Sequence, residues 1–185
     1  MYSNDSAQVE FIMLDASCLH EIAIAKANQT RTEIVQWFHS ILGKDRIVIV
    51  PEIVRYVVHR QLQLDRQSRV AFALEDLLKE LVCIPIDSEI TKRAAVISAD
   101  FRQENTELTL SMLDSLDKDA ILIAQHDKFK EDRKGKVNLV LTAFENNHSP
   151  LQGINIKNWR NISMKELSID FFKTHSCSKR GRSVN

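Results

Sequence analysis

Short runs of aliphatic and β-branched residues alternate along the chain with longer segments of helical periodicity. Continuous apolar runs of this length are typical of strands buried on both faces. We expect such strands at 9–15, 46–50, 81–86, 137–142 and 154–159. Because helical segments separate these runs, the strands should pair in parallel through right-handed crossovers. The pattern therefore predicts an α/β fold, a three-layer α/β/α sandwich with a central parallel sheet.

The segments between the strands predict the helices. One helix is expected over 19–42, before Gly43, and a second begins after Pro51 with a break near 65–68. A third follows Asp87 and Ser88, with Ser88 in position to cap it. Three further segments are assigned as follows: 106–116 as a loop with a partial turn, 117–129 as a short buried helix, and 163–175 as a terminal helix.

Length and composition indicate one folded unit. The chain has 185 residues, of which 44% are hydrophobic, enough for a substantial core. We expect a single domain over 9–175, with a disordered N-terminus at 1–8 and a disordered basic tail at 176–185.

Charge and cysteine content narrow the setting. Lys plus Arg and Asp plus Glu both number 25, so no overall field draws the chain to nucleic acid or membrane, and contacts with a polyanion must be local. The three cysteines form no CxxC pair and predict no disulfide framework, and Cys83 is expected to be a small buried hydrophobe. With no signal peptide or spanning run, we expect a cytoplasmic protein that makes no membrane contact.

Polar residues stand where the predicted strands end. Asp15 closes the run FIMLD, Glu52 follows the second strand after one proline, and Thr142 closes VNLVLT. The carboxyl ends of parallel strands meet at one edge of a sheet, which is where such folds bind ligands. We therefore expect these three residues to lie at a common edge.

A further acid, Asp119, precedes the apolar run 120–124 and should sit in the first turn of a helix. A helix N-terminus favours an ionised carboxylate. Several acids that repel one another are best tolerated around a hard cation such as Mg²⁺ or Mn²⁺. The acids therefore predict a metal site.

Five stretches, in order and spacing, resemble the successive motifs of the PIN domain family. They are LDAS at 14–17, VPEIVRYVV at 50–58, KDAILIAQ at 118–125, VLT at 140–142 and GINIKNW at 153–159. The resemblance implies a PIN-like sandwich whose active members are metal-dependent ribonucleases, VapC-like toxins of bacterial toxin–antitoxin pairs among them.

Carried over by position, the resemblance makes Asp15, Glu52 and Asp119 the catalytic acids that hold Mg²⁺ or Mn²⁺. Ser17 and Thr142 match the supporting hydroxyl residues. RNA is the implied substrate, with a cognate antitoxin and a homodimer as implied assemblies. Basic residues near the motifs are candidate RNA contacts, namely Arg55, Arg60, Lys134 and Lys136.

The fourth acidic position departs from the family pattern. The family usually has Asp or Asn two residues after the Thr, and this chain has Phe144, followed by Glu145, Asn146 and Asn147, of which Glu145 is the candidate fourth ligand and the two asparagines stay open as substitutes. Two functions therefore stay open: an endoribonuclease that hydrolyses RNA phosphodiester bonds, or a catalytically impaired PIN-like domain that binds protein or RNA.

Several of these residues also have a purely structural interpretation. Asp15 or Ser17 can cap the helix that follows, and Asp117 is the expected cap of the helix that carries Asp119. Only the coincidence of acids at one edge favours a site over capping.

Overall fold

Five parallel strands form the centre of the molecule. The computed structural model describes residues 10–42, 46–104, 110–133, 137–142 and 156–161. The strands are β1 (Glu10–Leu14), β2 (Arg46–Pro51), β3 (Val82–Ile84), β4 (Val137–Thr142) and β5 (Ile156–Asn158). They lie in the order β3-β2-β1-β4-β5, and every neighbouring pair is parallel.

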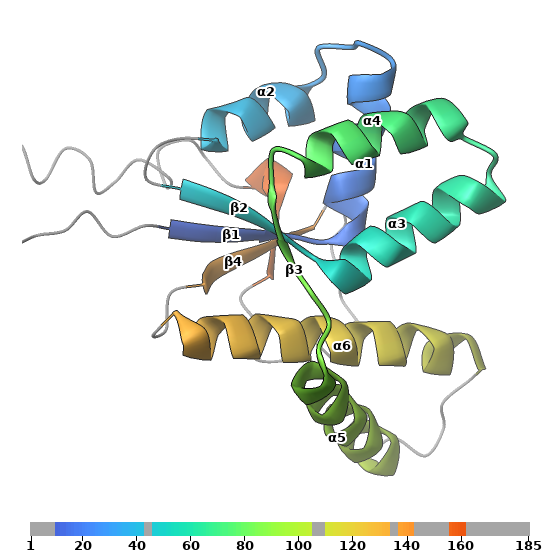
Figure 1. Cartoon of the computed structure of the whole chain (residues 1–185), viewed down its shortest axis with the longest axis vertical. Helices are drawn as coiled ribbons and strands as arrows, with labels where there is room; N and C mark the ends of the chain where they lie inside the picture. Colours follow the sequence, from blue (N-terminus) through green and yellow to red (C-terminus); the bar gives the residue numbers. More distant parts are fainter. Residues whose placement is uncertain (1–9, 43–45, 105–109, 134–136, 143–155, 162–185) are drawn as a thin grey trace, which may run out of the picture.

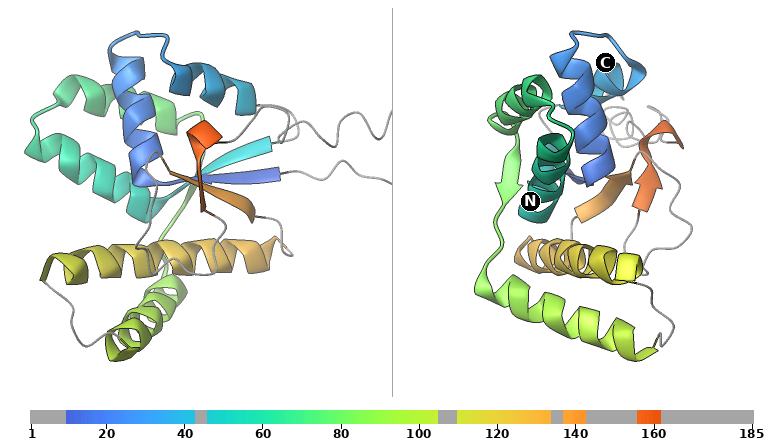
Figure 2. Two further views of the ribbon diagram at one scale, coloured as in Figure 1. Left: turned by 180° about the vertical axis from the view of Figure 1, so that it is seen from behind. Right: turned by 90° about the vertical axis from the view of Figure 1, so that its right-hand side faces the viewer.

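Helices cover both faces of this sheet (Figures 1 and 2). One face carries α1 (Ala16–Ala27), α2 (Glu33–Ile41), α3 (Glu52–Leu64) and α4 (Ser68–Leu78), with the short 3-10 helix η1 (Trp159–Asn161) beside them. The other face carries α6 (Leu110–Asp132), with α5 (Ser88–Glu104) packed outside it. The predicted three-layer α/β/α sandwich is therefore confirmed.

The core is distributed unequally between the two faces. Strand residues such as Ile12, Met13 and Leu14 are fully buried and join a large cluster with the helices α1 to α4. A separate small cluster between α5 and α6 has four buried members, Ile90, Ala94, Ala120 and Ala124. No helix within the described ranges has both the length and the apolar character needed to cross a membrane.

The prediction of one helix over 19–42 is wrong. Helix α1 ends at Ala27, with Asn28 as its C-cap. The chain then turns at Gln29, which has φ 54°, and α2 begins at Glu33. The amide of Thr30 donates to Ala25 O (3.1 Å) and that of Gln29 to Lys26 O (3.1 Å). This is a Schellman ending, which usually has glycine at the left-handed position. A glutamine there gives no sequence signal, whereas the predicted break at 65–68 is confirmed by the same turn at Arg66.

The helix that carries Asp119 begins earlier than expected. Residues 110–116, predicted as part of a loop, belong to α6, and the residues at 105–109 lie outside the described ranges. Buried Leu116, Ala120 and Ala124 repeat every four residues and continue the helical face toward the N-terminus. The helix includes Asp117, which is therefore no cap. Instead it accepts from Ser98 Oγ (2.7 Å) and Arg102 Nη2 (2.9 Å) on α5.

Two smaller expectations also change. The cap of α5 is Asp87, whose Oδ1 accepts from Ile90 N at 2.8 Å, and Ser88 is the first residue of the helix. Cys83 is exposed because β3 is an edge strand of the sheet. The helix predicted at 163–175 and the two termini predicted to be disordered lie outside the described residues.

Candidate functional site

Asp15 stands at the junction of β1 and α1. Its carboxylate is partly buried, and Oδ1 accepts from Cys18 N at 2.9 Å, so the residue caps α1. The hydroxyl of Ser17 donates to both carboxylate oxygens, at 2.7 and 2.9 Å from Oδ1 and Oδ2. The capping interpretation of Asp15 is thus correct, and Ser17 supports the acid instead of replacing it as the cap.

Asp119 comes from the opposite layer, near the middle of α6. The pKa of its carboxyl is raised to about 6, mainly by burial; the charge of Lys118 lowers it in part, and the charge of Asp15 adds a smaller increase. The helix-start argument for this acid is therefore wrong, because Asp119 lies far from the N-terminus of α6 and its ionised form is disfavoured. The shift also shows that Asp15 and Asp119 are near enough to repel each other.

Glu52 is the first residue of α3 and lies exposed at the end of β2. Its Oε2 accepts from the amide of Ile86, 2.6 Å away, in the segment that follows β3. Within the part of the chain that the structure describes, no three His, Cys, Asp or Glu side chains gather closely enough to hold one metal ion. The charge of Asp15 thus acts on Asp119, whereas Glu52 is held on a separate contact.

The remaining predicted site residues are only partly described. Thr142 ends β4 one residue after Leu141, the pairing partner of Leu14, so its backbone lies at the register of Asp15. Phe144, Glu145, Lys134 and Lys136 fall outside the described residues.

The two arginines proposed as RNA contacts both lie on α3. Arg55 pairs with Glu75 at 3.2 Å, and His59 contacts the same carboxylate. Burial by itself would raise the pKa of Glu75. The hydrogen bonds from His59 and Arg55 outweigh burial and lower this pKa, so the carboxylate stays ionised. Arg60 lies over the ring of Tyr56, 5.9 Å from its centroid. Part of the charge of Arg55 is therefore neutralised within the protein.

A second group near Asp15 escaped sequence analysis. On α1, Glu21 accepts from the indole of Trp159 (3.3 Å) and from Arg160 (2.9 Å), both in η1. Burial, followed by the charges of Asp15 and Glu21, raises the pKa of the Cys18 thiol far above its usual range, with Arg160 opposing. The thiol is therefore neutral and unsuited to act as a nucleophile.

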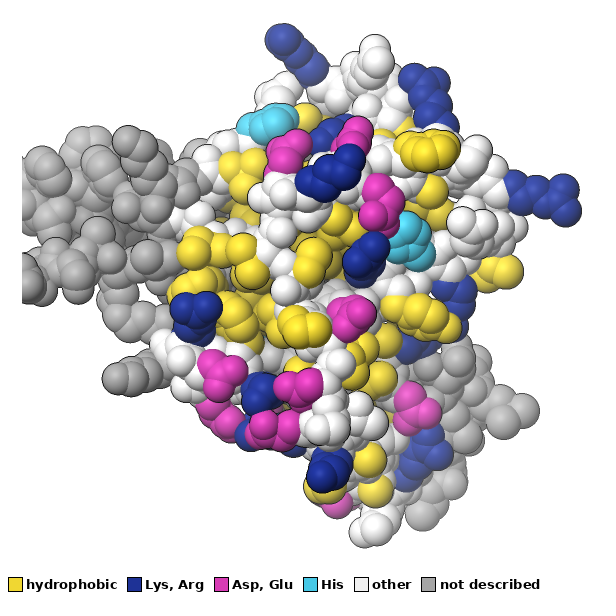
Figure 3. Space-filling model, viewed as in Figure 1, with side chains coloured by type: hydrophobic (Ala, Val, Ile, Leu, Met, Phe, Trp, Pro, Cys, Tyr) yellow, Lys and Arg dark blue, Asp and Glu magenta, His cyan; other side chains and the backbone are white. Residues whose placement is uncertain are grey.

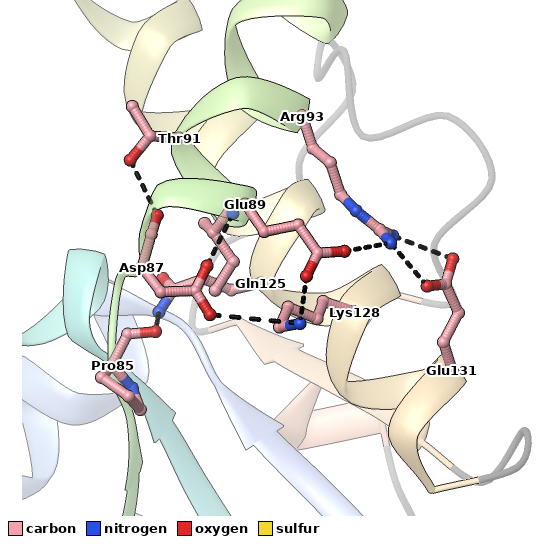
Figure 4. Close-up of polar contacts among 9 residues, drawn as sticks. Pro85, Asp87, Glu89, Thr91, Arg93, Gln125, Lys128 and Glu131 are labelled. Carbon is pink, nitrogen blue, oxygen red and sulfur yellow. Dashed lines mark hydrogen bonds and ion pairs between the residues drawn. The ribbon is translucent and has the colours of Figure 1, made fainter.

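Gln125 was also missed, although it is fully buried on α6. Its amide Nε2 donates to Ile84 O at 2.7 Å and to Pro85 O at 3.3 Å, the latter drawn in Figure 4. Its Oε1 accepts from Ile53 N at 3.3 Å. The only signal in the sequence is a glutamine within the apolar run of α6.

The chemistry of the site fits a hard divalent cation. Asp15 and Asp119 offer carboxylate oxygens, the ligands that Mg²⁺ and Mn²⁺ prefer. Two acids that raise each other's cost of ionisation gain most when a cation lies between them. The candidate site therefore combines two acids from different elements, Asp15 at the junction of β1 and α1 and Asp119 on α6.

Neither a protein-family model nor a curated protein sequence matches this chain. Among solved structures, it is similar to a chain in VapBC2 from Rickettsia felis bound to a DNA fragment from their promoter. That match has 15% identity and a TM-score of 0.54, and it covers 80% of this chain and 98% of that one. A chain in DNA-bound VapBC from Salmonella typhimurium matches with 15% identity and a TM-score of 0.49. That match covers 82% of this chain and 99% of that one. The first likeness shows a common fold.

Proposed function

We propose that this chain is a PIN-type, metal-dependent endoribonuclease. The observation that carries the proposal is the meeting of Asp15 and Asp119, seen in the effect of one charge on the pKa of the other. Burial and the charge of Asp15 both oppose the ionisation of Asp119, and the charge of Lys118 offsets them only in part. A bound cation would offset both costs.

Asp15 and Asp119 would hold the ion, and Ser17 fixes the orientation of the first of them. When bound, Mg²⁺ or Mn²⁺ lowers the pKa of a water molecule and offsets the charge that builds on a phosphodiester during cleavage. Glu52 is proposed as the third acid; it lies at the end of the neighbouring strand β2, and only its Oε2 accepts from the amide of Ile86. Thr142 and Glu145 remain proposed as supporting residue and fourth ligand.

RNA with an accessible single-stranded or looped segment is the proposed substrate. A site at the edge of a sheet must reach a phosphate that a regular duplex keeps from close approach. Arg55, Arg60, Lys134 and Lys136 are proposed to contact the backbone, since the net charge of zero supplies no general attraction. Such contacts would make binding weaken as salt increases.

A protein partner of the antitoxin class is also proposed. It is supported by the resemblance to PIN-type toxins and by the fold shared with a chain of the VapBC2 assembly. A homodimer stays a prediction from the family resemblance, and a cytoplasmic location stays a prediction from the sequence pattern.

The test is cleavage of a structured RNA with Mn²⁺ by the wild type, by Asp15→Asn and by Asp100→Asn. Asn can still cap α1, so Asp15→Asn should fold normally and lose cleavage by at least about a hundredfold. The exposed Asp100 on α5 is the matched control, and its variant should cleave like the wild type. Full cleavage by Asp15→Asn would reject the proposal.

A second candidate function is a catalytically impaired PIN-like domain that binds protein or RNA. It is favoured by the hydrogen bond that holds Glu52 at Ile86, away from a three-acid group. A folded wild type that binds RNA without cleaving it, with Mg²⁺ or Mn²⁺ present, would select this function over the first.

A further inference from the structure

Gln125 does for α3 what a capping side chain normally does. The residue at the cap position of α3 is Pro51, and it makes no side-chain hydrogen bond to the helix. Gln125 Oε1 instead accepts from Ile53 N, the amide that a capping Ser or Asp would satisfy. The cap of α3 is therefore supplied by a different helix, α6.

The same side chain holds the end of the neighbouring strand. Pro51 and Ile84 are paired residues at the ends of β2 and β3. Gln125 Nε2 donates to Ile84 O and to Pro85 O at the end of β3. Because its Oε1 accepts from Ile53 N just after β2, the side-chain amide bridges the ends of both strands. Because Gln125, Ile53 and Ile84 are all buried, the amide of Ile53 and the carbonyl of Ile84 lack ready access to water in its place.

Glu52 lies between the two segments that Gln125 fixes. Its backbone precedes Ile53, and its carboxylate accepts from Ile86, which directly follows Pro85. The chain neighbours of the two residues that locate the Glu52 side chain, Ile53 beside Glu52 and Pro85 beside Ile86, are thus hydrogen-bonded to one buried amide. A shift of Gln125 would therefore change the distance between the segment at Ile53 and the segment at Pro85, and with it the position of the Glu52 carboxylate.

Gln125 also belongs to the helix that carries Asp119. Six residues separate them, which is a rise of about 9 Å along a helix axis. We infer that Gln125 is a positioning residue, which sets the place of the Glu52 carboxylate relative to Asp119 by tying α3 and the end of β3 to α6. The effect of Gln125 on catalysis rests on the proposed nuclease function, whereas the hydrogen bonds that Gln125 makes do not.

The main variant is Gln125→Met, which keeps the volume and removes all three hydrogen bonds. Loss of a residue that orients metal-site groups typically lowers metal affinity or activity about 10- to 100-fold. We expect that loss in Mn²⁺ affinity and in RNA cleavage, and no change in Gln63→Met, which alters an exposed glutamine of α3. Gln125→Asn, which keeps the amide but withdraws it by one methylene, should show a smaller loss and serves if Gln125→Met does not fold.

A double-variant comparison separates positioning from general stability. If Gln125 acts through Glu52, Gln125→Met should cause no further loss of Mn²⁺ affinity or cleavage in a Glu52→Gln background, while thermal stability falls in both backgrounds. The same fold-loss of activity in both backgrounds would overturn the inference.

The position of Glu52 can also be read without any activity. The amide proton signal of Ile86 in an NMR spectrum should move in Gln125→Met, or in Gln125→Asn, toward its position in Glu52→Gln. An unchanged Ile86 signal would overturn the inference even if activity fell. A wild type that neither binds Mn²⁺ nor cleaves RNA would reject the proposed function alone, because the Ile86 signal still decides whether Gln125 places Glu52.

Discussion

The helices that pack on the sheet and the outer helix α5 are held in place by different forces: even α6 adds Leu122 and Phe129 to the core of the strands. On the side of α1 to α4, fully buried aliphatic residues such as Leu19, Ile22 and Leu74 continue the core of the strands. On the other side, α5 meets α6 through a cluster made mostly of alanine. One layer is thus fixed by apolar burial, and the outer helix of the other has little of it.

Ion pairs supply much of the remaining contact between α5 and α6. Arg93 on α5 pairs with Glu131 on α6 (2.8 Å), and Lys128 on α6 pairs with Glu89 on α5 (2.6 Å); Arg93 also pairs with Glu89 within α5 (2.7 Å) (Figure 4). Figure 3 shows acidic and basic side chains interleaved on this part of the surface. Exposed pairs of this kind each add little stability, because water and salt screen them.

The difference matters because the candidate site draws on both layers. Asp15 and Glu52 begin helices of the apolar layer, while Asp119 and Gln125 lie on α6. The distance between the acids is therefore set by how α6 docks on the sheet. Because the site takes residues from both layers, a change in the packing of one layer can alter the position of an acid relative to those of the other layer.

The largest effect should come from the apolar layer. Leu74 on α4 is fully buried, so Leu74→Ala should lower the free energy of unfolding by about 2–5 kcal/mol. Urea denaturation followed by circular dichroism measures it. The control is Val96→Ala on the exposed face of α5, which should change stability by less than about 0.5 kcal/mol. Equal losses in the two variants would remove the proposed contrast between the layers.

An intermediate effect should appear where the layers meet. Because the pKa of Asp119 is raised to about 6, its protonated form stabilises the fold at low pH, and that contribution is lost as pH rises through 6. Without metal, Asp119→Asn should therefore stabilise the protein at pH 7.5, by about 1 kcal/mol after allowance for solvent screening. At pH 4.5 the difference should shrink. Asp100→Asn, measured in the same way, should show no such pH-dependent gain.

The smallest effect should come from the ion pairs of the outer layer. Arg93→Met removes the pairs with Glu89 and Glu131 and should lower the melting temperature by less than about 2 °C at low salt. In 1 M NaCl the difference from the wild type should narrow further. A large loss that salt does not reduce would mean that Arg93 stabilises α5 by packing rather than by charge.

The sequence predicts best what continuous apolar runs determine. The strands at 46–50 and 137–142 lie within one residue of β2 and β4, and their parallel order follows from the helices between them. It fails where a local rule is broken. Gln29 takes the left-handed turn that glycine usually takes, and residues 110–116, predicted as part of a loop, extend the correctly predicted buried helix of α6 toward its N-terminus.

The candidate site divides in the same way. The strand-end rule places Asp15 and Glu52 correctly at the ends of β1 and β2. It could not show that Ile86 holds Glu52, because that contact depends on where the edge strand β3 ends. Nor could it find Gln125, whose three partners lie 40 or more residues away in sequence. Long-range hydrogen bonds of one buried side chain leave no periodic pattern.

Calorimetric titration of Mn²⁺ into the wild type and Asp119→Asn, at pH 7.5 and pH 5.0, tests the pairing of Asp15 with Asp119 most directly. A carboxyl with a pKa of about 6 must lose its proton to bind metal, so the wild type should bind about tenfold more weakly at pH 5.0. Asp119→Asn should bind weakly at both pH values, with a much smaller pH dependence. Equal affinity in the two proteins at pH 7.5, or no binding by the folded wild type, would contradict a shared metal site.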